Sequence, residues 1–253
     1  MKTVSLSRDM VHTGPLILVN RDHPYREGSP DKTLAPVDAM NSNVLLERRV
    51  ASVYDKLMDK LYARSRITAV SGWRSQREQE KIYGDSLLEN GTDFTAKYVA
   101  LPGHSEHQTG LAVDLALNQP DIDFIRPHFP YTGVCGAFRE LAGRFGFIER
   151  YQEGKENITG IAYEPWHFRY VGAPHAVIME QMGDTLEEYH ARIRQFPYGR
   201  DPLQYNPGSS EIEISYLPAD KEIVTFDIED DMPYSVSGNN MDGFVVTVWR
   251  ASR

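Results

Sequence analysis

The segment SEHQTGLAVDLAL (105–117) decides the fold, because its second half alternates between two kinds of side chain. Successive residues of a strand point to opposite faces of a sheet. One face is apolar and consists of Leu111, Val113 and Leu115. The other face carries two very small residues and one carboxylate, Gly110, Ala112 and Asp114. The sequence therefore predicts a strand over 110–117 whose small-residue face lets another group approach the backbone closely beside Asp114.

The segments on either side of this strand show helical and extended patterns. Apolar residues at helical spacing, together with capping and stop signals, predict helices over 42–64, 76–90, 134–147 and 174–195. The helix over 76–90 opens with a capping box, Ser75 with Glu78, and stops at Gly91. Apolar runs predict strands at 15–20, 67–73 and 158–172, the last broken by a turn at Pro165. The elements indicate an α+β fold.

The charge composition and the residue pattern of the chain change after a Pro/Gly-containing linker that ends near residue 207. Residues 208–253 hold nine acidic and three basic residues, and they include EIEISYLPA, IVTFDI and GFVVTVWRA, which predict three strands. The segment SGNNMDG, which lies between Val236 and Phe244, is typical of a hairpin turn. Three strands over ~45 residues are marginally stable alone. We therefore expect a main domain over 1–200 and an acidic β-strand appendix over 208–253 that docks on it.

The composition excludes several classes of protein. The chain has 253 residues, 27 Lys and Arg, 36 Asp and Glu, and a net charge of −9, so it lacks the basic surface that nucleic acid or an anionic membrane requires. Its hydrophobic fraction of 41% is enough for a packed core. The single cysteine, Cys135, excludes an internal disulfide and a cysteine-based zinc finger. The N-terminal segment has no apolar signal region, and no window reaches the ~20 apolar residues of a membrane span. We expect a cytoplasmic protein with no nucleic-acid or membrane partner.

Two of the eight histidines have acidic neighbours at metal-ligand spacing. His107 precedes Asp114 by seven residues, and His167 follows Glu164 by three. Because seven is odd, His107 cannot share one face of an unbroken strand with Asp114 and must lie in the turn that enters the strand. Pro165 likewise places Glu164 and His167 around a bend. Two imidazoles and one carboxylate are a ligand set that zinc accepts, with a position left open for water.

Other histidines are weaker candidates. His104 is a rival ligand, since H-x-x-H also suits a metal, but it follows Pro-Gly and precedes the strand, so it ranks below His107. A lone histidine near an aspartate is more often a surface or hydrogen-bonded core residue, and the added Glu-x-x-His is what favours a metal here. The remaining five lack such partners and are interpreted as surface or core residues: His12, His23, His128, His175 and His190.

Three motifs together resemble the zinc D,D-peptidases of the VanX/VanY family. They are SGWRSQREQ (71–79), SEHQTGLAVD (105–114) and EPWH (164–167), which match S-G-x-R-S, S-x-H-x-x-G-x-A-x-D and E-x-x-H at every fixed position and in the same order. The resemblance covers about residues 15–197, and the chain length is most similar to that of the bifunctional VanXY members, which act in the cytoplasm. It implies a small, mostly antiparallel sheet flanked by helices, with one zinc ion per chain.

The resemblance also implies an activity and a set of site residues. The activity is hydrolysis of the dipeptide D-Ala-D-Ala, removal of C-terminal D-Ala from peptidoglycan precursors, or both, associated with vancomycin resistance. The substrate partner would be a small peptide ending in D-Ala-D-Ala. The implied residues are the zinc ligands His107, Asp114 and His167, the catalytic base Glu164, Arg74 beside the scissile carbonyl, and Gln79 and Ser105 in substrate binding.

Alternative interpretations remain at the level of sequence. Without the resemblance, Arg74 would be assigned to a surface salt bridge, Gln79 to a solvated helix face and Ser105 to a turn. An L-Ala-D-Glu endopeptidase of the endolysin type is a second function, disfavoured because a short acidic appendix suits an anionic cell wall poorly. A non-catalytic zinc-binding module is a third, and the presence of both Glu164 and Arg74 argues against it.

Some features bear on the shape of the pocket. Trp166 lies between two site residues, and it is equally consistent with a pocket wall and with the core. The irregular stretches 21–36, 92–104 and 118–133 are candidates for shaping the room around the substrate.

Overall fold

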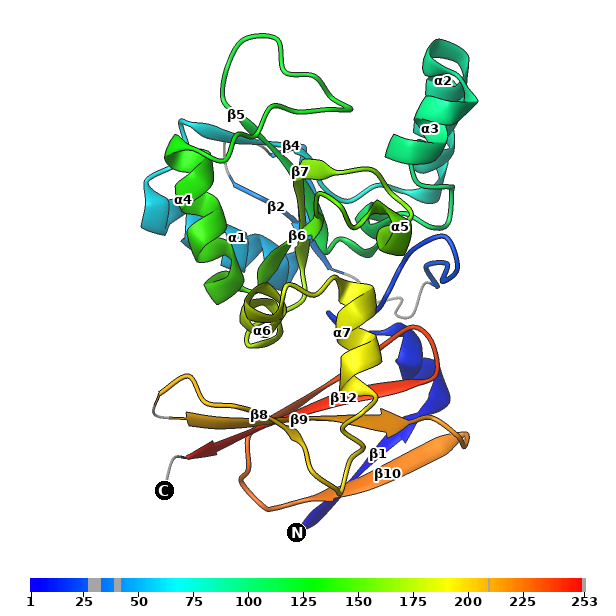
Figure 1. The fold of residues 1–253 in the computed structure, drawn as a ribbon, viewed down its shortest axis with the longest axis vertical. Helices are drawn as coiled ribbons and strands as arrows, with labels where there is room; N and C mark the ends of the chain where they lie inside the picture. The colour runs from blue at the N-terminus through cyan, green and yellow to red at the C-terminus, as the bar shows by residue number, and fades with distance from the viewer. Residues whose placement is uncertain (27–32, 39–41, 209, 252–253) are drawn as a thin grey trace. The chain divides into compact units, whose positions relative to one another are not determined.

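The computed structural model describes residues 1–26, 33–38, 42–208 and 210–251. The chain forms two compact units, whose elements are drawn in Figure 1. The central unit consists of Val19–Tyr25 and Asp31–Thr185, and the terminal unit consists of Met1–Leu18, Arg26–Pro30 and Leu186–Arg253.

This division differs from the expected one at residues 200–208. The reason is strand pairing between the two ends of the chain: β1 (Lys2–Ser7) pairs antiparallel with β10 (Ile223–Ile228). Local sequence patterns carry no information on such a distant partner. The expected docking of the C-terminal strands on the main domain stays a prediction.

A four-stranded antiparallel sheet forms the middle of the central unit. Its strands, in spatial order, are β4 (Ile67–Ser71), β5 (Ala112–Leu117), β7 (Glu164–Tyr170) and β6 (Phe147–Tyr151). Asp114 of β5 pairs with His167 of β7 on one side and with Ser71 of β4 on the other. The register therefore brings the three sequence motifs to adjacent strands, and the predicted small antiparallel sheet flanked by helices is confirmed.

Strand β5 is buried on both of its faces. Ala112, Val113 and Leu115 are inaccessible to solvent, and Asp114 is only 5% exposed. The small side chains on the face of Asp114 leave room for neighbouring groups, as the alternation predicted. A carboxylate at such a position must find charged or hydrogen-bonding partners, because burying it unpaired would be costly.

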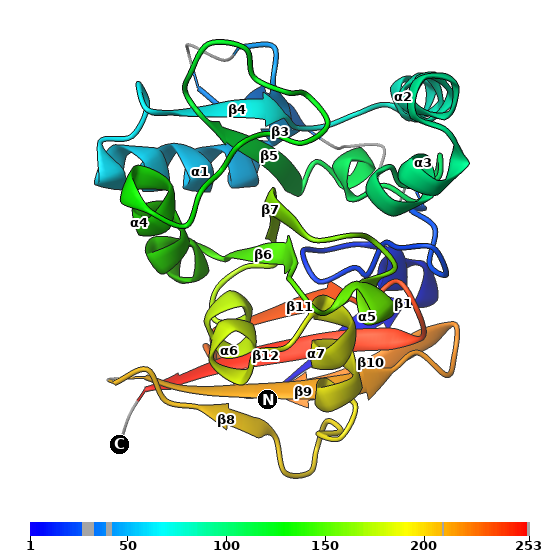
Figure 2. The ribbon, with the colours of Figure 1, turned by 45° about the horizontal axis from the view of Figure 1, so that its top comes forward.

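Helices and two short strands complete the central unit, and Figure 2 shows α1 and α4 side by side and α2 next to α3. The short strands β2 (Leu34–Pro36) and β3 (Leu45–Glu47) pair with each other. The helices are α1 (Arg48–Leu61), α2 (Gln76–Asn90), α3 (Thr92–Tyr98), α4 (Gly133–Ala142), α5 (Glu156–Thr159) and α6 (His175–Met182), with 3-10 helices η2 (Glu106–Thr109) and η3 (Gly143–Phe145).

Local capping explains where these helices begin. The capping box of Ser75 and Glu78 is present at the start of α2, as predicted. Helix α1, expected from residue 42, begins only at Arg48, because the preceding residues pair as β3 and the Glu47 carboxylate accepts the N–H groups of Arg49 and Val50 at 3.0 and 3.2 Å. Occupation of these otherwise unpaired N–H groups fixes the helix start.

Within the run PLILVN the four residues 16–19 are buried, as expected, and Pro15 and Asn20 are partly exposed, but the run does not form the predicted strand. Their backbone is satisfied by irregular contacts instead: the N–H of Leu16 donates to Ser237 Oγ at 2.9 Å, and the N–H of Leu18 donates to the carbonyl of Asn239 at 3.1 Å. An apolar run alone does not specify a strand ladder.

The turn predicted at Pro165 is wrong, because β7 runs through this proline without a break. The preceding residues of 158–172 contain the end of helix α5 in place of a strand. The irregularity lies in the pairing of β7 with β6, whose register shifts between Glu149 and Tyr151. Pro165, which has no N–H to donate, lies within this irregular stretch.

The single helix predicted over 174–195 is also wrong. It is divided into α6 and α7 (Leu186–Ile193) by Gly183, which adopts a left-handed conformation at φ 65° and ends α6. Glycine adopts this conformation without the steric cost that a Cβ imposes. Helix α6 belongs to the central unit and α7 to the terminal unit.

The terminal unit is built mainly from strands around an apolar core. Its sheet has the order β11 (Tyr234–Gly238), β12 (Gly243–Ala251), β9 (Ser210–Pro218) and β8 (Leu203–Tyr205), and β1 pairs separately with β10. The three predicted C-terminal strands are confirmed as β9, β10 and β12. The predicted hairpin turn joins β11 to β12, where Gly238 pairs with Phe244. No described helix of either unit is long and apolar enough to cross a membrane.

Candidate metal centre and active site

The segment after β4, which belongs to the motif SGWRSQREQ, contacts η2, which belongs to the motif SEHQTGLAVD. His107, in η2, donates from Nδ1 to the carbonyl of Gly72 at 2.6 Å, since a carbonyl can only accept. The chain here passes so close to β3 that a Cβ on Gly72 would lie 2.3 Å from the carbonyl oxygen of Leu45. This close approach explains the glycine of the S-G-x-R segment: any larger residue would displace the carbonyl that orients His107.

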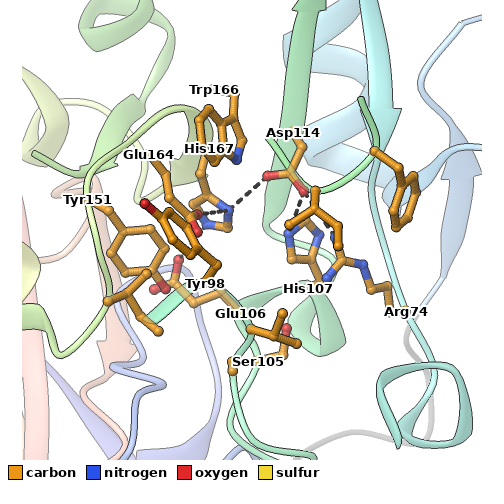
Figure 3. Close-up of a pocket in the computed structure, with 15 residues that line it drawn as sticks. Arg74, Tyr98, Ser105, Glu106, His107, Asp114, Tyr151, Glu164, Trp166 and His167 are labelled. Carbon is orange, nitrogen blue, oxygen red and sulfur yellow. Dashed lines mark hydrogen bonds and ion pairs between the residues drawn. The ribbon is translucent and has the colours of Figure 1, made fainter. Parts of the chain in front are cut away.

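Three side chains converge on one point, as Figure 3 shows. Nε2 of His107 lies 3.1 Å from Oδ2 of Asp114, and Nδ1 of His167 lies 2.9 Å from Oδ1 of the same carboxylate. The three side chains are buried, and each offers a ligand atom within 4.8 Å of the others. The three ligands predicted from the sequence are therefore brought together. The predicted position of His107 in the turn before β5 is also confirmed.

The chemistry of this donor set fits zinc. Two imidazole nitrogens and one carboxylate are ligands that catalytic zinc sites use, with a further position open. Nδ1 of His107 is engaged by Gly72, so its Nε2 carries the lone pair that faces Asp114. The residues His107, Asp114 and His167 could thus hold a zinc ion on the side that faces the pocket.

The electrostatics of the three residues reflect their burial and mutual contacts. Burial, together with the positive charge of Arg74, lowers the pKa of His107. Burial alone would raise the pKa of Asp114, but the two histidines hold it well below its ordinary value. Burial would lower the pKa of His167, yet its contacts with Asp114 and Glu106 raise that pKa to about 9. A metal binding here would compete with a proton on His167.

Glu164 lies at the start of β7 and faces the same pocket (Figure 3). On a regular strand Glu164 and His167, three residues apart, would face opposite sides of the sheet. The irregular pairing with β6 allows both to reach the pocket, with a Glu164 carboxylate oxygen 3.9 Å from Nδ1 of His167. Burial raises the pKa of Glu164 to about 8, in the range where a carboxyl group can take up and release a proton near neutral pH.

Arg74 reaches the centre from the other side. Its Nη2 donates to Oδ2 of Asp114 at 3.0 Å, and its Nε donates to Ser71 Oγ at 2.9 Å. The side chain lines the pocket and is 14% exposed. Burial lowers its pKa, opposed by Asp114 and Glu164, and a guanidinium remains charged at neutral pH. The arrangement presents a fixed positive group beside the ligands.

The two expected substrate-binding residues occupy different surroundings. Ser105 is buried and lines the pocket. Gln79 lies behind Arg74: its Oε1 accepts from Arg74 Nη1 at 3.4 Å, and its Nε2 donates to the carbonyl of Ala100 at 2.8 Å. The described lining of the pocket does not include Gln79, so its contacts are those of a support for Arg74.

Sequence reasoning missed Glu106, the residue between Ser105 and His107. Its carboxylate is buried, with Oε2 3.2 Å from Nε2 of His167 and Oε1 2.8 Å from Nε of Arg150. The pattern S-x-H leaves this position open and so gave no signal. A charged residue in a segment leading into a buried strand was the one available hint.

Aromatic and apolar residues form the remaining pocket walls. Trp166 lines the pocket and is only 8% exposed, so it forms a wall of the pocket and also belongs to the buried core. The ring of Tyr151 lies 4.8 Å from that of His167. The stretches 92–104 and 118–133 contribute Tyr98 and Phe124 to the pocket, as expected, but Tyr98 lies at the end of helix α3 and not in an irregular segment. Of the third stretch, 21–36, residues 27–32 lie outside the described part of the chain.

His104 is not part of the cluster of ligands in the described residues. Its Nδ1 donates a hydrogen bond to the carbonyl oxygen of Asn20 at 2.8 Å. The ranking of His107 above His104 therefore agrees with the geometry.

The fold and this site are those of a metal-dependent hydrolase. Residues 43–173 match the model of the VanY family, D-alanyl-D-alanine carboxypeptidase. The chain is also 43% identical, over 183 residues, to the bifunctional D-Ala-D-Ala dipeptidase and D-Ala-D-Ala carboxypeptidase VanXYC of Enterococcus gallinarum. That match covers 71% of this chain and 95% of the relative. The chain belongs to the VanY family.

Solved structures agree with this assignment. The vancomycin resistance D,D-dipeptidase VanXYg, in complex with a D-Ala-D-Ala phosphinate analogue, has 49% identity and a TM-score of 0.95, and the match covers 98% of this chain and 99% of that one. A variant of the vancomycin resistance D,D-pentapeptidase VanY from a VanB-type cassette, in complex with Zn(II), has 30% identity and a TM-score of 0.56. That match covers 70% of this chain and 98% of the other.

Proposed function

We propose that this protein is a zinc-dependent D,D-peptidase of the cytoplasm. It hydrolyses the dipeptide D-Ala-D-Ala and removes the terminal D-Ala from peptidoglycan precursors, and so contributes to vancomycin resistance. The observation that carries the proposal is the convergence of His107, Asp114 and His167 on one pocket that Glu164 and Arg74 also face. Relatives that act on D-Ala-D-Ala support the choice of substrate.

One zinc ion per chain would be held by His107, Asp114 and His167. When bound, zinc supplies Lewis-acid polarisation and a water whose pKa falls toward ~7. Glu164 is the general base, because its carboxylate is buried at the pocket and lies 3.9 Å from His167, too far to be tied up in a hydrogen bond with it. It accepts the proton of the attacking water and then gives it to the amine of the leaving D-Ala.

Arg74 stabilises the negative charge that develops on the carbonyl oxygen of the scissile bond. Its guanidinium is fixed by Ser71, Gln79 and Asp114, so little reorganisation is needed when the charge appears. Ser105, which lines the pocket, binds the substrate. Gln79 acts on the substrate through Arg74, which it orients.

The walls of the pocket support a small substrate. Tyr98, Tyr151 and Trp166 enclose the space beside Glu164 and His167 with aromatic rings. Such walls suit the methyl groups and short backbone of D-Ala-D-Ala better than a cross-linked polymer. This favours a peptidase of soluble precursors over an endopeptidase of intact wall.

The experiment that tests the proposal measures the release of D-Ala from peptide substrates by the zinc-loaded protein. D-Ala-D-Ala and a UDP-linked pentapeptide are offered in parallel, with intact cell wall and an L-Ala-D-Glu peptide as comparison substrates. We expect both D-Ala-D-Ala substrates to be cleaved, the activity to disappear with a chelator and to return with zinc. Cleavage of the L-Ala-D-Glu bond alone would support the endolysin type. Zinc binding without turnover of any substrate would support a non-catalytic module.

A further inference from the structure

Glu106 connects the two histidines of the candidate metal centre. It is joined through the main chain to His107, and its Oε2 lies 3.2 Å from Nε2 of His167. Its side chain is 1% exposed, so it is withdrawn from bulk solvent. Neither the sequence pattern nor the proposed reaction uses this carboxylate.

Two buried arginines hold the charge of Glu106. Nε of Arg150 in β6 and Nη1 of Arg169 in β7 each donate to Oε1 at 2.8 Å, and both arginine side chains are inaccessible to solvent. Their cations keep Glu106 ionised, so Oε2 can only accept a hydrogen bond. Nε2 of His167 must then carry the proton.

The proton on Nε2 determines what the other ring nitrogen can do. A neutral imidazole has one N–H and one lone pair, so a proton on Nε2 leaves the lone pair on Nδ1. Nδ1 is the atom that faces Asp114, at 2.9 Å, and thus the other candidate ligands. Buried ion clusters contribute little net stability in general, so stability alone gives a weak reason for placing three charges here.

We propose that Glu106 is a positioning residue of the metal centre, which fixes His167 as the Nε2–H tautomer and so presents its Nδ1 lone pair to zinc. The inference rests on the proposed zinc site. Because Glu106 is also the neighbour of His107, a shift of its carboxylate would disturb both imidazoles. Partners of this kind typically change metal affinity by about 10–100-fold when they are removed.

The first test compares E106Q with R150Q. In E106Q the single amide oxygen is attracted to the two arginines, which turns the amide N–H₂ toward Nε2 of His167 and favours the wrong tautomer. R150Q also removes one charge from the same buried cluster but leaves the contact of Glu106 with His167. We expect E106Q to weaken zinc binding about 10–100-fold in competition with a chelating dye, and R150Q to leave it unchanged. Thermal melting of both variants reports the structural cost of a lost buried charge.

The second test reads the tautomer directly in the zinc-loaded wild-type protein. ¹⁵N-edited NMR of labelled histidine distinguishes an N–H nitrogen from a metal-bound one. The ring of His167 is assigned through its contact with Tyr151. We expect a slowly exchanging proton on Nε2 of His167, and on Nδ1 of His107. This measurement decides the question even if E106Q does not fold.

The outcomes separate the inference from the function on which it rests. Wild-type protein that binds no zinc would overturn the proposed function. A zinc-bound protein with the proton on Nδ1 of His167, or equal zinc affinities for E106Q, R150Q and the wild type, would overturn the role of Glu106 alone. Equal losses in E106Q and R150Q would assign the cluster a purely structural role.

Discussion

The two histidines of the metal centre are held by opposite kinds of partner. His107 donates from Nδ1 to a neutral main-chain carbonyl, that of Gly72, in an irregular segment after a strand. His167 contacts a charged side chain, Glu106, from within a strand, and two arginines balance that charge. A carbonyl support depends on the path of the backbone and is sensitive to added volume. A carboxylate support depends on charge and is sensitive to its neutralisation.

The largest expected effect comes from E164Q, which leaves both supports intact. Loss of the general base should lower kcat about 10²–10⁴-fold, while zinc affinity stays that of the wild type, because neither histidine loses its partner. Steady-state kinetics with D-Ala-D-Ala and a zinc competition assay on the same preparation measure the two quantities. A variant that keeps wild-type kcat would remove Glu164 from the reaction.

The next largest effect on kcat is expected from Arg74, which lies on the same side of the site as His107. R74Q keeps most of the side-chain volume and removes the charge, and it should lower kcat by about 10²–10³-fold. R74K restores the charge without the planar fork that meets Ser71, Gln79 and Asp114, so it should recover only part of the loss. Equal kcat for R74Q and the wild type would contradict a role in stabilising the developing charge.

A third prediction concerns a side chain added at Gly72, whose carbonyl accepts the hydrogen bond of His107. In G72A the new Cβ would lie 2.3 Å from the Leu45 carbonyl oxygen, so the backbone must shift and the acceptor of His107 moves with it. We expect a loss of about 1–3 kcal/mol in unfolding free energy and weaker zinc binding. G84A is the matched control: Gly84 lies inside α2, with nothing within 4 Å of its added Cβ. That variant should gain about 0.5–1 kcal/mol with zinc affinity unchanged. Equal zinc affinity in G72A and G84A would dissociate Gly72 from the metal centre.

The same contrast explains how much of the site could be predicted from the sequence. His107 and Asp114 are predictable as ligands because they lie seven residues apart in one motif, and His167 because it follows Glu164 by three residues in another. The resemblance to the VanX/VanY family joins the two motifs into one site. Glu106 escaped notice because its function arises only when η2 meets β6 and β7, at Arg150 and Arg169. A one-dimensional pattern records an acidic residue and not the partners that bury it.

The fold shows a related boundary between local and distant information. The capping box at Ser75 and the strand at 112–117 were predicted because their determinants lie within a few residues. The pairing of β1 with β10 and the uninterrupted course of β7 through Pro165 depend on neighbouring strands. Gln79 illustrates the same point within the site: its burial behind Arg74 comes from the contact of α2 with the segment near Ala100.

The smallest expected effect concerns a carboxylate that supports the site from outside. Glu78 accepts the N–H and hydroxyl of Ser75 at 2.8 and 2.7 Å, at the start of α2 and directly after Arg74. These hydrogen bonds lower the pKa of Glu78 below its ordinary value of 4.5. A carboxyl group with a lowered pKa in the folded state stabilises the protein above its unfolded pKa, and this contribution is lost as the pH falls through the folded pKa. E78Q should therefore be less stable than the wild type by about 0.3–1 kcal/mol at pH 7, and the difference should shrink below pH 4.5, the ordinary pKa. Urea unfolding at several pH values measures this difference in stability.

Because Glu78 is exposed and does not contact either histidine, the zinc affinity of E78Q at pH 7 should equal that of the wild type. A change comparable to that of E106Q would mean that the centre is sensitive to charge at a distance, and the contrast between a carbonyl support and a charged support would no longer explain it.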